Sequence, residues 1–131
     1  MITLYYGTGS TSCRQTAQWF EKHGISFKKK RIERISKKDL ISALSLSENG
    51  FSDLLKRSSL VKSDIKNIID SIQYMTFNES IEYIIKHPNV LKVPLVIDEN
   101  KIAVGYNTEE MRAFVPRYYR ELELMYKGLL E

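Results

Sequence analysis

The chain has 131 residues, a length that fits one domain or one domain with an insertion, and its net charge of +4 is mildly basic. Hydrophobic residues make up 43% and charged residues 27%, the balance of a soluble globular protein, and no apolar run approaches membrane-spanning length. One cysteine excludes a disulfide framework and fits a reducing compartment, so we expect a cytoplasmic protein. With only two histidines beside that cysteine, we expect neither a metal site nor a cofactor.

The first third of the chain predicts a strand, a polar turn, a helix and a second strand. Met1–Tyr6 forms the first strand, and Thr11–His23 follows helical spacing with Cys13 on its apolar face. Gly24 ends that helix, and Phe27–Arg31 forms the second strand. A strand, a tight polar turn and a helix with cysteine chemistry in its first turn make up the thioredoxin-like layout.

The middle of the chain predicts helix after helix, and strands then return. The expected elements are a helix from Ser36 that breaks at Glu48-Asn49-Gly50, a turn at Phe51–Arg57, a helix at Asp64–Ser71, a helix capped by Thr76 and ended by Pro88, a hairpin of Leu95–Ile97 and Lys101–Val104, a helix capped by Asn107, and a charged helical segment after Pro116. The predicted fold class is α/β, a thioredoxin-like mixed sheet with an inserted all-helical subdomain. One domain spans 1–131: a thioredoxin-like part at about 1–33 and 93–131, and a helical insertion at about 34–92.

Ser10 stands where a redox protein of this layout carries a cysteine. A disulfide switch needs two thiols at Cys-x-x-Cys spacing, so Ser10-x-x-Cys13 cannot close a disulfide within the chain. Two interpretations of Cys13 remain: a thiol made reactive by the helix N-terminus, and a buried, inert small hydrophobe, which we favour. We expect Ser10 to cap the helix, because serine caps helices well and no histidine base stands near it in sequence.

A basic run occupies the second predicted strand and the residues after it. It contains Lys28, Lys29, Lys30, Arg31, Arg34, Lys37 and Lys38, against Glu33 and Asp39 only. Such a run favours a polyanion or an acidic protein surface. It is also typical of a solvated strand edge, where lysines discourage aggregation, and we favour this interpretation because no aromatic residues interleave as a single-strand binder requires.

The order of elements resembles the arsenate-reductase-like family and, within it, most closely the Spx group of transcriptional regulators. The resemblance covers almost the whole chain, and the order and spacing of its motifs together make it specific. The motifs are Leu4-Tyr5, Ser10-x-x-Cys13 with Thr11-Ser12-Cys13-Arg14, Glu48-Asn49-Gly50, His87-Pro88, Val93-Pro94, Ile97-Asp98-Glu99, Val104-Gly105-Tyr106-Asn107 with Glu110, Arg112-Ala113-Phe114 and Pro116-Arg117.

The resemblance implies binding to the C-terminal domain of the RNA polymerase α subunit, with promoter DNA reached only in the polymerase complex. In Spx-like proteins a glycine of the helical half lies in that interface. Gly50 matches it, so Gly50, Glu48 and Asn49 are the expected partner-binding residues. A glycine there serves close backbone approach or a positive φ, and the alternative is a C-cap of the preceding helix. The resemblance also implies a cis peptide bond at Val93-Pro94.

Two departures separate the chain from its relatives that sense oxidation or reduce arsenate. The sensors have two cysteines, and the reductases place an arginine just before the strand-three proline, where this chain has Val93. An arginine would hold an oxyanion by bidentate bonds, which valine cannot do, and Tyr106 replaces a further arginine near Gly105. We therefore expect a non-enzymatic, Spx-like regulator without a disulfide switch. The alternatives are an arsenate-reductase-like or monothiol oxidoreductase using Cys13, and a direct nucleic-acid binder using the basic run.

Overall fold

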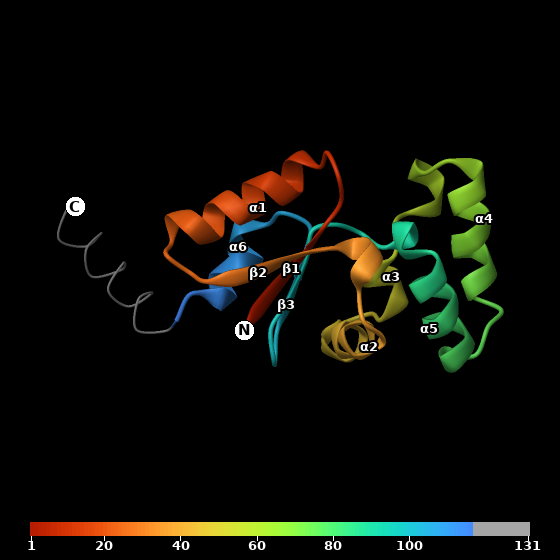
Figure 1. Cartoon of the computed structure of the whole chain (residues 1–131). Helices are drawn as coiled ribbons and strands as arrows, with labels where there is room; N and C mark the ends of the chain where they lie inside the picture. The colour runs from red at the N-terminus through yellow and green to blue at the C-terminus, as the bar shows by residue number, and fades with distance from the viewer. Residues whose placement is uncertain (117–131) are drawn as a thin grey trace.

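A four-stranded mixed sheet forms the centre of the computed structural model, which describes residues 1–116 (Figure 1). The elements in chain order are β1 (Ile2–Tyr6), α1 (Thr11–Lys22), β2 (Phe27–Arg31), α2 (Lys37–Leu46), α3 (Phe51–Leu54), α4 (Ser63–Ile72), α5 (Phe77–Lys86), β3 (Leu95–Ile97), β4 (Ile102–Val104) and α6 (Thr108–Met111). Short 3-10 turns lie at Ile32–Arg34, Ser58–Leu60, Pro88–Val90 and Arg112–Phe114. The helix expected after Pro116 lies outside the described residues.

The strand order β2-β1-β3-β4 places β1 inside the sheet and β2 at one edge. β1 pairs in parallel with β2, with Ile2 opposite Phe27, and antiparallel with β3, with Leu4 opposite Val96. β3 and β4 form the predicted hairpin. The α/β fold class is confirmed: a mixed sheet interrupted in the chain by helices α2 to α5.

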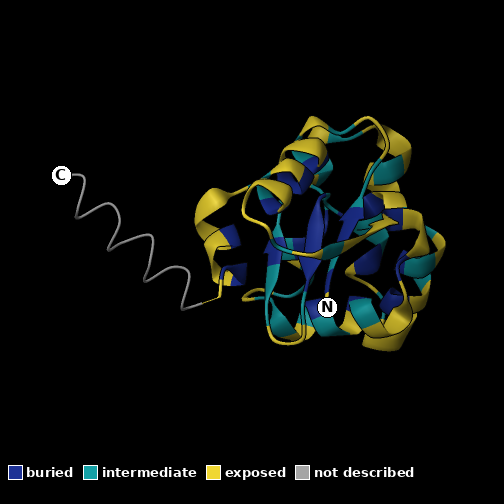
Figure 2. Cartoon of the chain, turned by 60° about the vertical axis from the view of Figure 1, so that its left-hand side comes forward, coloured by how far each residue is buried: buried dark blue, intermediate teal, exposed yellow. Residues whose placement is uncertain are grey.

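Alternating residues of β1 and β3 feed two hydrophobic cores, one on each face of the sheet. Leu4 and Val96 pack with Phe20 of α1, and this core also takes Met111 and Phe114. The opposite face of the sheet packs against the helical half, which is the segment of helices α2 to α5. The core there contains Tyr5, Leu95, Ile97, Leu40, Ile81 and Ile84. Figure 2 shows the buried strands enclosed by helices whose outer sides are exposed. The helices thus contribute residues at 3.6-residue spacing, and the strands residues at 2-residue spacing, to these two cores.

A partly buried hydrogen bond ties the sheet to helix α2. The Tyr5 hydroxyl, on a side chain that is fully buried, donates to the Asp39 carboxylate in the first turn of α2. Burial raises the pKa of the Tyr5 phenol well above its ordinary value, and the hydrogen bond from its hydroxyl to Asp39 raises it further. The two residues are 34 positions apart, so this contact fixes how α2 sits against β1.

The structure corrects one predicted element and bears out several others. Phe51–Leu54 is a short helix, α3, where the sequence predicted only a turn. The capping box at Thr76 and Glu79 is present, and Asn107 caps α6 by accepting from the backbone N–H groups of Glu109 and Glu110. The Val93–Pro94 peptide bond is cis, as expected. None of the helices within residues 1–116 has the length and apolar character needed to cross a bilayer.

Candidate functional site

Ser10 caps helix α1, as predicted. Its backbone is extended, and its Oγ accepts a hydrogen bond from the Cys13 backbone N–H at 3.2 Å. The cap satisfies one of the free N–H groups at the helix start, where a redox relative would carry its first thiol.

Cys13 is a free thiol that is only 3% exposed. It shares the buried face of α1 with Thr16, Ala17 and Phe20. The Thr16 hydroxyl donates to the Ser12 carbonyl at 2.8 Å, so this hydroxyl already has its hydrogen-bond acceptor within helix α1. Burial on an apolar helix face supports the inert interpretation of Cys13, because thiol chemistry needs access as well as a thiolate.

Replacing Ser10 with alanine is expected to lower the free energy of unfolding by about 1 kcal/mol, because the Cys13 N–H loses its acceptor. Urea denaturation followed by circular dichroism measures the change. Ser12→Ala is the matched control, since Ser12 lies inside the helix and alanine is favoured there. Equal effects of the two substitutions would contradict a capping role for Ser10.

Val93, at the position where the resemblance implies an arginine in arsenate reductases, packs against the turn between β1 and α1. A Cβ added to Gly7 would lie 3.1 Å from Val93 Cγ2, so the valine methyl touches the turn backbone. Arg14, in the first turn of α1, is exposed and donates to Thr11 Oγ1 at 3.2 Å. Val93 therefore makes an apolar contact near the start of the helix that carries Cys13, where binding of an oxyanion would require a cation.

Gly50 does not end helix α2, so the alternative interpretation of it as a C-cap is wrong. Helix α2 ends at Ser47, whose N–H bonds to the carbonyls of Ala43 and Leu44. Gly50 instead begins α3 as its N-cap, with φ +68° and ψ −131°. This is backbone that residues with a Cβ adopt only under strain, so the conformational reason for glycine holds.

A hydrogen-bond network holds the loop of Ser47 to Asp53, which we call the Gly50 loop. The Ser47 hydroxyl accepts from the Gly50 N–H at 3.0 Å and donates to Leu44 O at 2.6 Å. The Asp53 carboxylate accepts from the Asn49 backbone N–H at 2.9 Å and from its side-chain amide at 3.2 Å. These bonds, led by the one from the Asn49 backbone, lower the pKa of Asp53. Asn49, expected to face a partner, thus also positions the loop.

The Gly50 loop presents free space on one side and borders a cleft on the other. A Cβ added at Gly50 would meet no atom within 4 Å, and Glu48 and Asn49 are exposed. The cleft has a volume of about 700 Å³ and lies between the loop and the β3–β4 end of the sheet. Its lining includes Glu48, Asp53, Lys92, Val93, Gly105 and Glu110. The sequence analysis missed Asp53 and Lys92 and named Glu110 only as part of a family motif, since no local pattern brings the three together.

The two sets of predicted residues, at the start of α1 and in the Gly50 loop, differ in their accessibility. Ser10 and Cys13 form a closed helix start, whereas Glu48, Asn49 and Gly50 form an ordered, accessible loop. Within residues 1–116, no three His, Cys, Asp or Glu side chains gather in a way that could hold a metal ion.

Solved structures share this fold at low sequence identity. A putative ArsC family related protein from Bacteroides fragilis matches with a TM-score of 0.72 at 19% identity, covering 86% of this chain and 96% of that one. An arsenate reductase from Vibrio cholerae matches with a TM-score of 0.71 at 14% identity, covering 87% and 97%. These likenesses show the thioredoxin-like fold of that family.

Curated relatives are more similar in sequence. The global transcriptional regulator Spx of Streptococcus pneumoniae is 36% identical over 126 residues, which are 95% of this chain and 92% of the relative. The protein of the same name from Streptococcus pyogenes serotype M1 is 34% identical over 128 residues, with the same coverage. The model of the ArsC family matches residues 5–114. This chain therefore belongs to the ArsC family and groups with its Spx members.

Proposed function

We propose that this protein is a transcriptional regulator that binds the C-terminal domain of the RNA polymerase α subunit through the Gly50 loop. The observation that carries the proposal is Gly50 itself, a positive-φ glycine with open space where its side chain would be. Its relatives over nearly the full length are named global transcriptional regulators. The protein would act in the cytoplasm, where the polymerase works.

The loop has the properties that a docking point needs. Its backbone is held before binding by the bonds of Ser47 and Asp53, so little ordering entropy is lost on association. The missing side chain at Gly50 lets another backbone approach closely. In this proposal the partner docks beside the boundary between the thioredoxin-like part, about 1–33 and 93–131, and the helical insertion, about 34–92.

Isothermal titration calorimetry with the purified α C-terminal domain tests the proposal. We expect saturable binding of one domain per chain. A titration without heat at several temperatures, together with no complex in size-exclusion chromatography, would contradict it.

Oxidation is expected to leave the affinity for the α C-terminal domain unchanged. Ser10 cannot form a sulfur bridge, and its hydrogen bond to Cys13 N holds the helix start in one arrangement whatever the oxidant level. The measurement is partner affinity in reducing agent and after mild treatment with diamide or peroxide, with intact mass recorded for each sample. A several-fold change that tracks an adduct on Cys13 would show that the single thiol is a sensor.

Ser10→Cys is the complementary variant for this test. A second thiol at Cys-x-x-Cys spacing at a helix start suits an intramolecular disulfide, so oxidation of this variant should remove two hydrogens from its mass. Its affinity should then respond to oxidant while that of the wild type does not.

Arsenate reduction through Cys13 is the enzymatic alternative, favoured only by the shared fold. We expect no turnover above background with glutathione or thioredoxin systems, because Val93, which packs on Gly7, cannot make a bidentate bond to the oxyanion. A coupled assay that follows NADPH consumption measures this. Turnover that disappears in Cys13→Ala would overturn the non-enzymatic assignment.

A further inference from the structure

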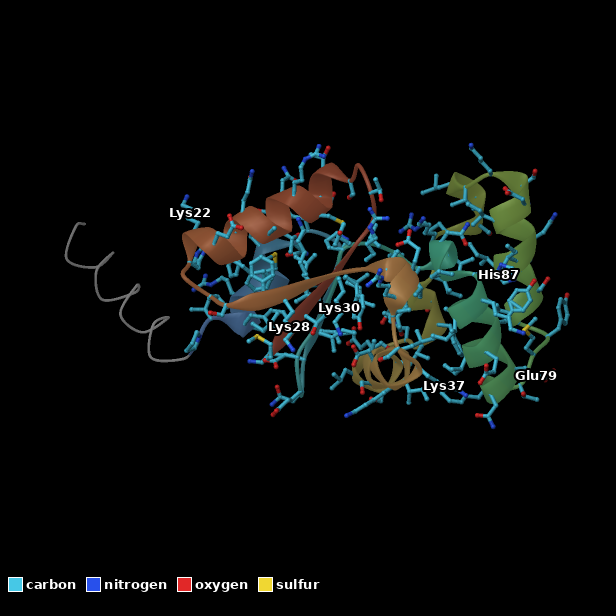
Figure 3. All side chains as sticks on the ribbon, in the orientation of Figure 1. Lys22, Lys28, Lys30, Lys37, Glu79 and His87 are labelled. Carbon is cyan, nitrogen blue, oxygen red and sulfur yellow. The ribbon has the colours of Figure 1, made fainter. Side chains whose placement is uncertain are left out.

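Strand β2 exposes four consecutive cations along an open edge of the sheet. In the described part of the chain β2 pairs only with β1, so its other side is free. Lys28, Lys29, Lys30 and Arg31 are all exposed. Figure 3 shows Lys28 and Lys30 along this strand, on the near side of the molecule.

These four cations have no carboxylate partner among residues 1–116. The ion pairs found there are the N-terminus with Asp98, and Lys37 with Glu82. Lys29 lies over the Tyr6 ring, with its Nζ 4.9 Å from the centroid, which fixes its stem and leaves its charge unneutralised. The edge therefore has a concentrated positive potential that a polyanion would neutralise.

The cations form two rows, one on each side of the sheet. Lys28 and Lys30 stand opposite Thr3 and Tyr5, so they lie on the face of the helical half. Lys29 and Arg31 stand opposite Leu4 and Tyr6, so they lie on the face of α1. Arg34 and Lys38, both exposed, extend the basic surface beyond the strand, and of the two nearby acids Asp39 already accepts from Tyr5.

We propose that this edge, the residues Lys28 to Arg31, binds the sugar–phosphate backbone of duplex DNA without reading its sequence. Cations on one face of a β-strand repeat every two residues, about 6.6 Å, which is close to twice the roughly 3.4 Å axial rise per nucleotide of one DNA strand, so each row can meet alternate phosphates. The proposal goes beyond the Gly50 loop and requires neither that loop nor the polymerase.

The same surface fits other anionic partners less well. Single-stranded nucleic acid binds by stacking on aromatic side chains, whereas Phe27, the aromatic residue of β2, packs on Phe20 with the ring centroids 5.3 Å apart. A membrane surface requires apolar side chains beside the charges, and none is exposed on β2. Lysines on an edge strand also discourage aggregation, but that task does not require four cations in succession.

Fluorescence anisotropy with a labelled random-sequence duplex of about 20 base pairs, between about 50 and 200 mM salt, tests the proposal. The variant is Lys28→Gln with Lys30→Gln. The control is Lys66→Gln with Lys86→Gln, two exposed lysines on α4 and α5, which changes the net charge equally. Because each lost phosphate contact lowers the slope of log K against log salt by about 0.9, the β2 variant should lose about 1.8 from its slope. Its affinity at low salt should fall about tenfold or more, and the control should bind like the wild type.

Three results would overturn the proposal. Equal losses of duplex affinity in the two variants would show that binding depends only on net charge. If the wild type does not bind the duplex at low salt, the lysines only discourage aggregation at the strand edge. Binding of a polyglutamate peptide as tightly as the duplex would assign the surface to an acidic protein. Thermal unfolding of both variants at the wild-type temperature ensures that the comparison reports binding.

Discussion

Gly50→Arg is expected to abolish binding to the α C-terminal domain while the protein stays folded. The arginine side chain would project into the open space beside Gly50, which in the complex would be filled by the partner. A backbone with φ +68° also strains any residue with a Cβ, by about 1–3 kcal/mol, and shifts the loop that the partner would contact. In calorimetry we expect the affinity to fall at least about 100-fold, which corresponds to about 2.7 kcal/mol.

Gly24→Arg is the matched control for this experiment. Gly24 also has a positive φ, +64°, and open space at its Cβ, but it follows helix α1 at a distance in the chain from the Gly50 loop. The Gly24 variant therefore also places a side chain on a positive-φ position and adds the same charge. Unchanged affinity in Gly50→Arg would leave Gly50 only a conformational role, and an equal loss in Gly24→Arg would assign the effect to strain or charge.

Tyr5→Phe is expected to lower the free energy of unfolding by about 1–3 kcal/mol, because Asp39 loses a buried donor while its carboxylate stays partly buried. Chemical denaturation measures this change. The double variant Tyr5→Phe with Asp39→Asn completes a thermodynamic cycle, since contacting residues are coupled. If the two single effects simply add, the hydrogen bond does not join the sheet to α2 energetically.

The same pair should give the protein an alkaline stability loss. The pKa of Tyr5 is raised in the folded state, first by burial and then by the hydrogen bond and charge of Asp39. Its stabilising contribution is therefore complete below the ordinary tyrosine pKa of about 10 and falls as the pH rises above it. Denaturation at pH 8 and at higher pH should show a steeper loss for the wild type than for Tyr5→Phe. Parallel pH profiles would contradict the assignment.

Elements and caps with a local signal were predictable from the sequence. The strand Ile2–Tyr6, the helix Thr11–Lys22 and the caps at Ser10 and Thr76 depend on spacings of a few residues, which the periodicity and capping rules describe. Helix α3 has only four residues, too few for a helical period to appear, and it was taken for a turn.

Features that join distant parts of the chain had no such signal. From the sequence, Gly50 could also be the C-cap of the preceding helix, because glycine often ends helices. Only the observed end of α2 at Ser47 shows that Gly50 begins the next helix. The contact of Tyr5 with Asp39 and the meeting of Asp53 with Lys92 at the cleft depend on how the helical half packs against the sheet. Tertiary packing decides these, and a single sequence does not display it.

The position of β1 inside the sheet has a consequence for synthesis on the ribosome. β1 and β2 emerge early and can pair, but the other neighbour of β1 is β3, which follows only after the whole helical half. At roughly 5–20 residues per second, the stretch from Arg31 to Leu95 takes roughly 3–13 seconds to appear. For that time one side of β1 is an open, apolar strand edge, able to pair with a strand of another chain. A product truncated after α5 keeps that edge open permanently, so we regard β3 as the element that protects the newly made chain from aggregation.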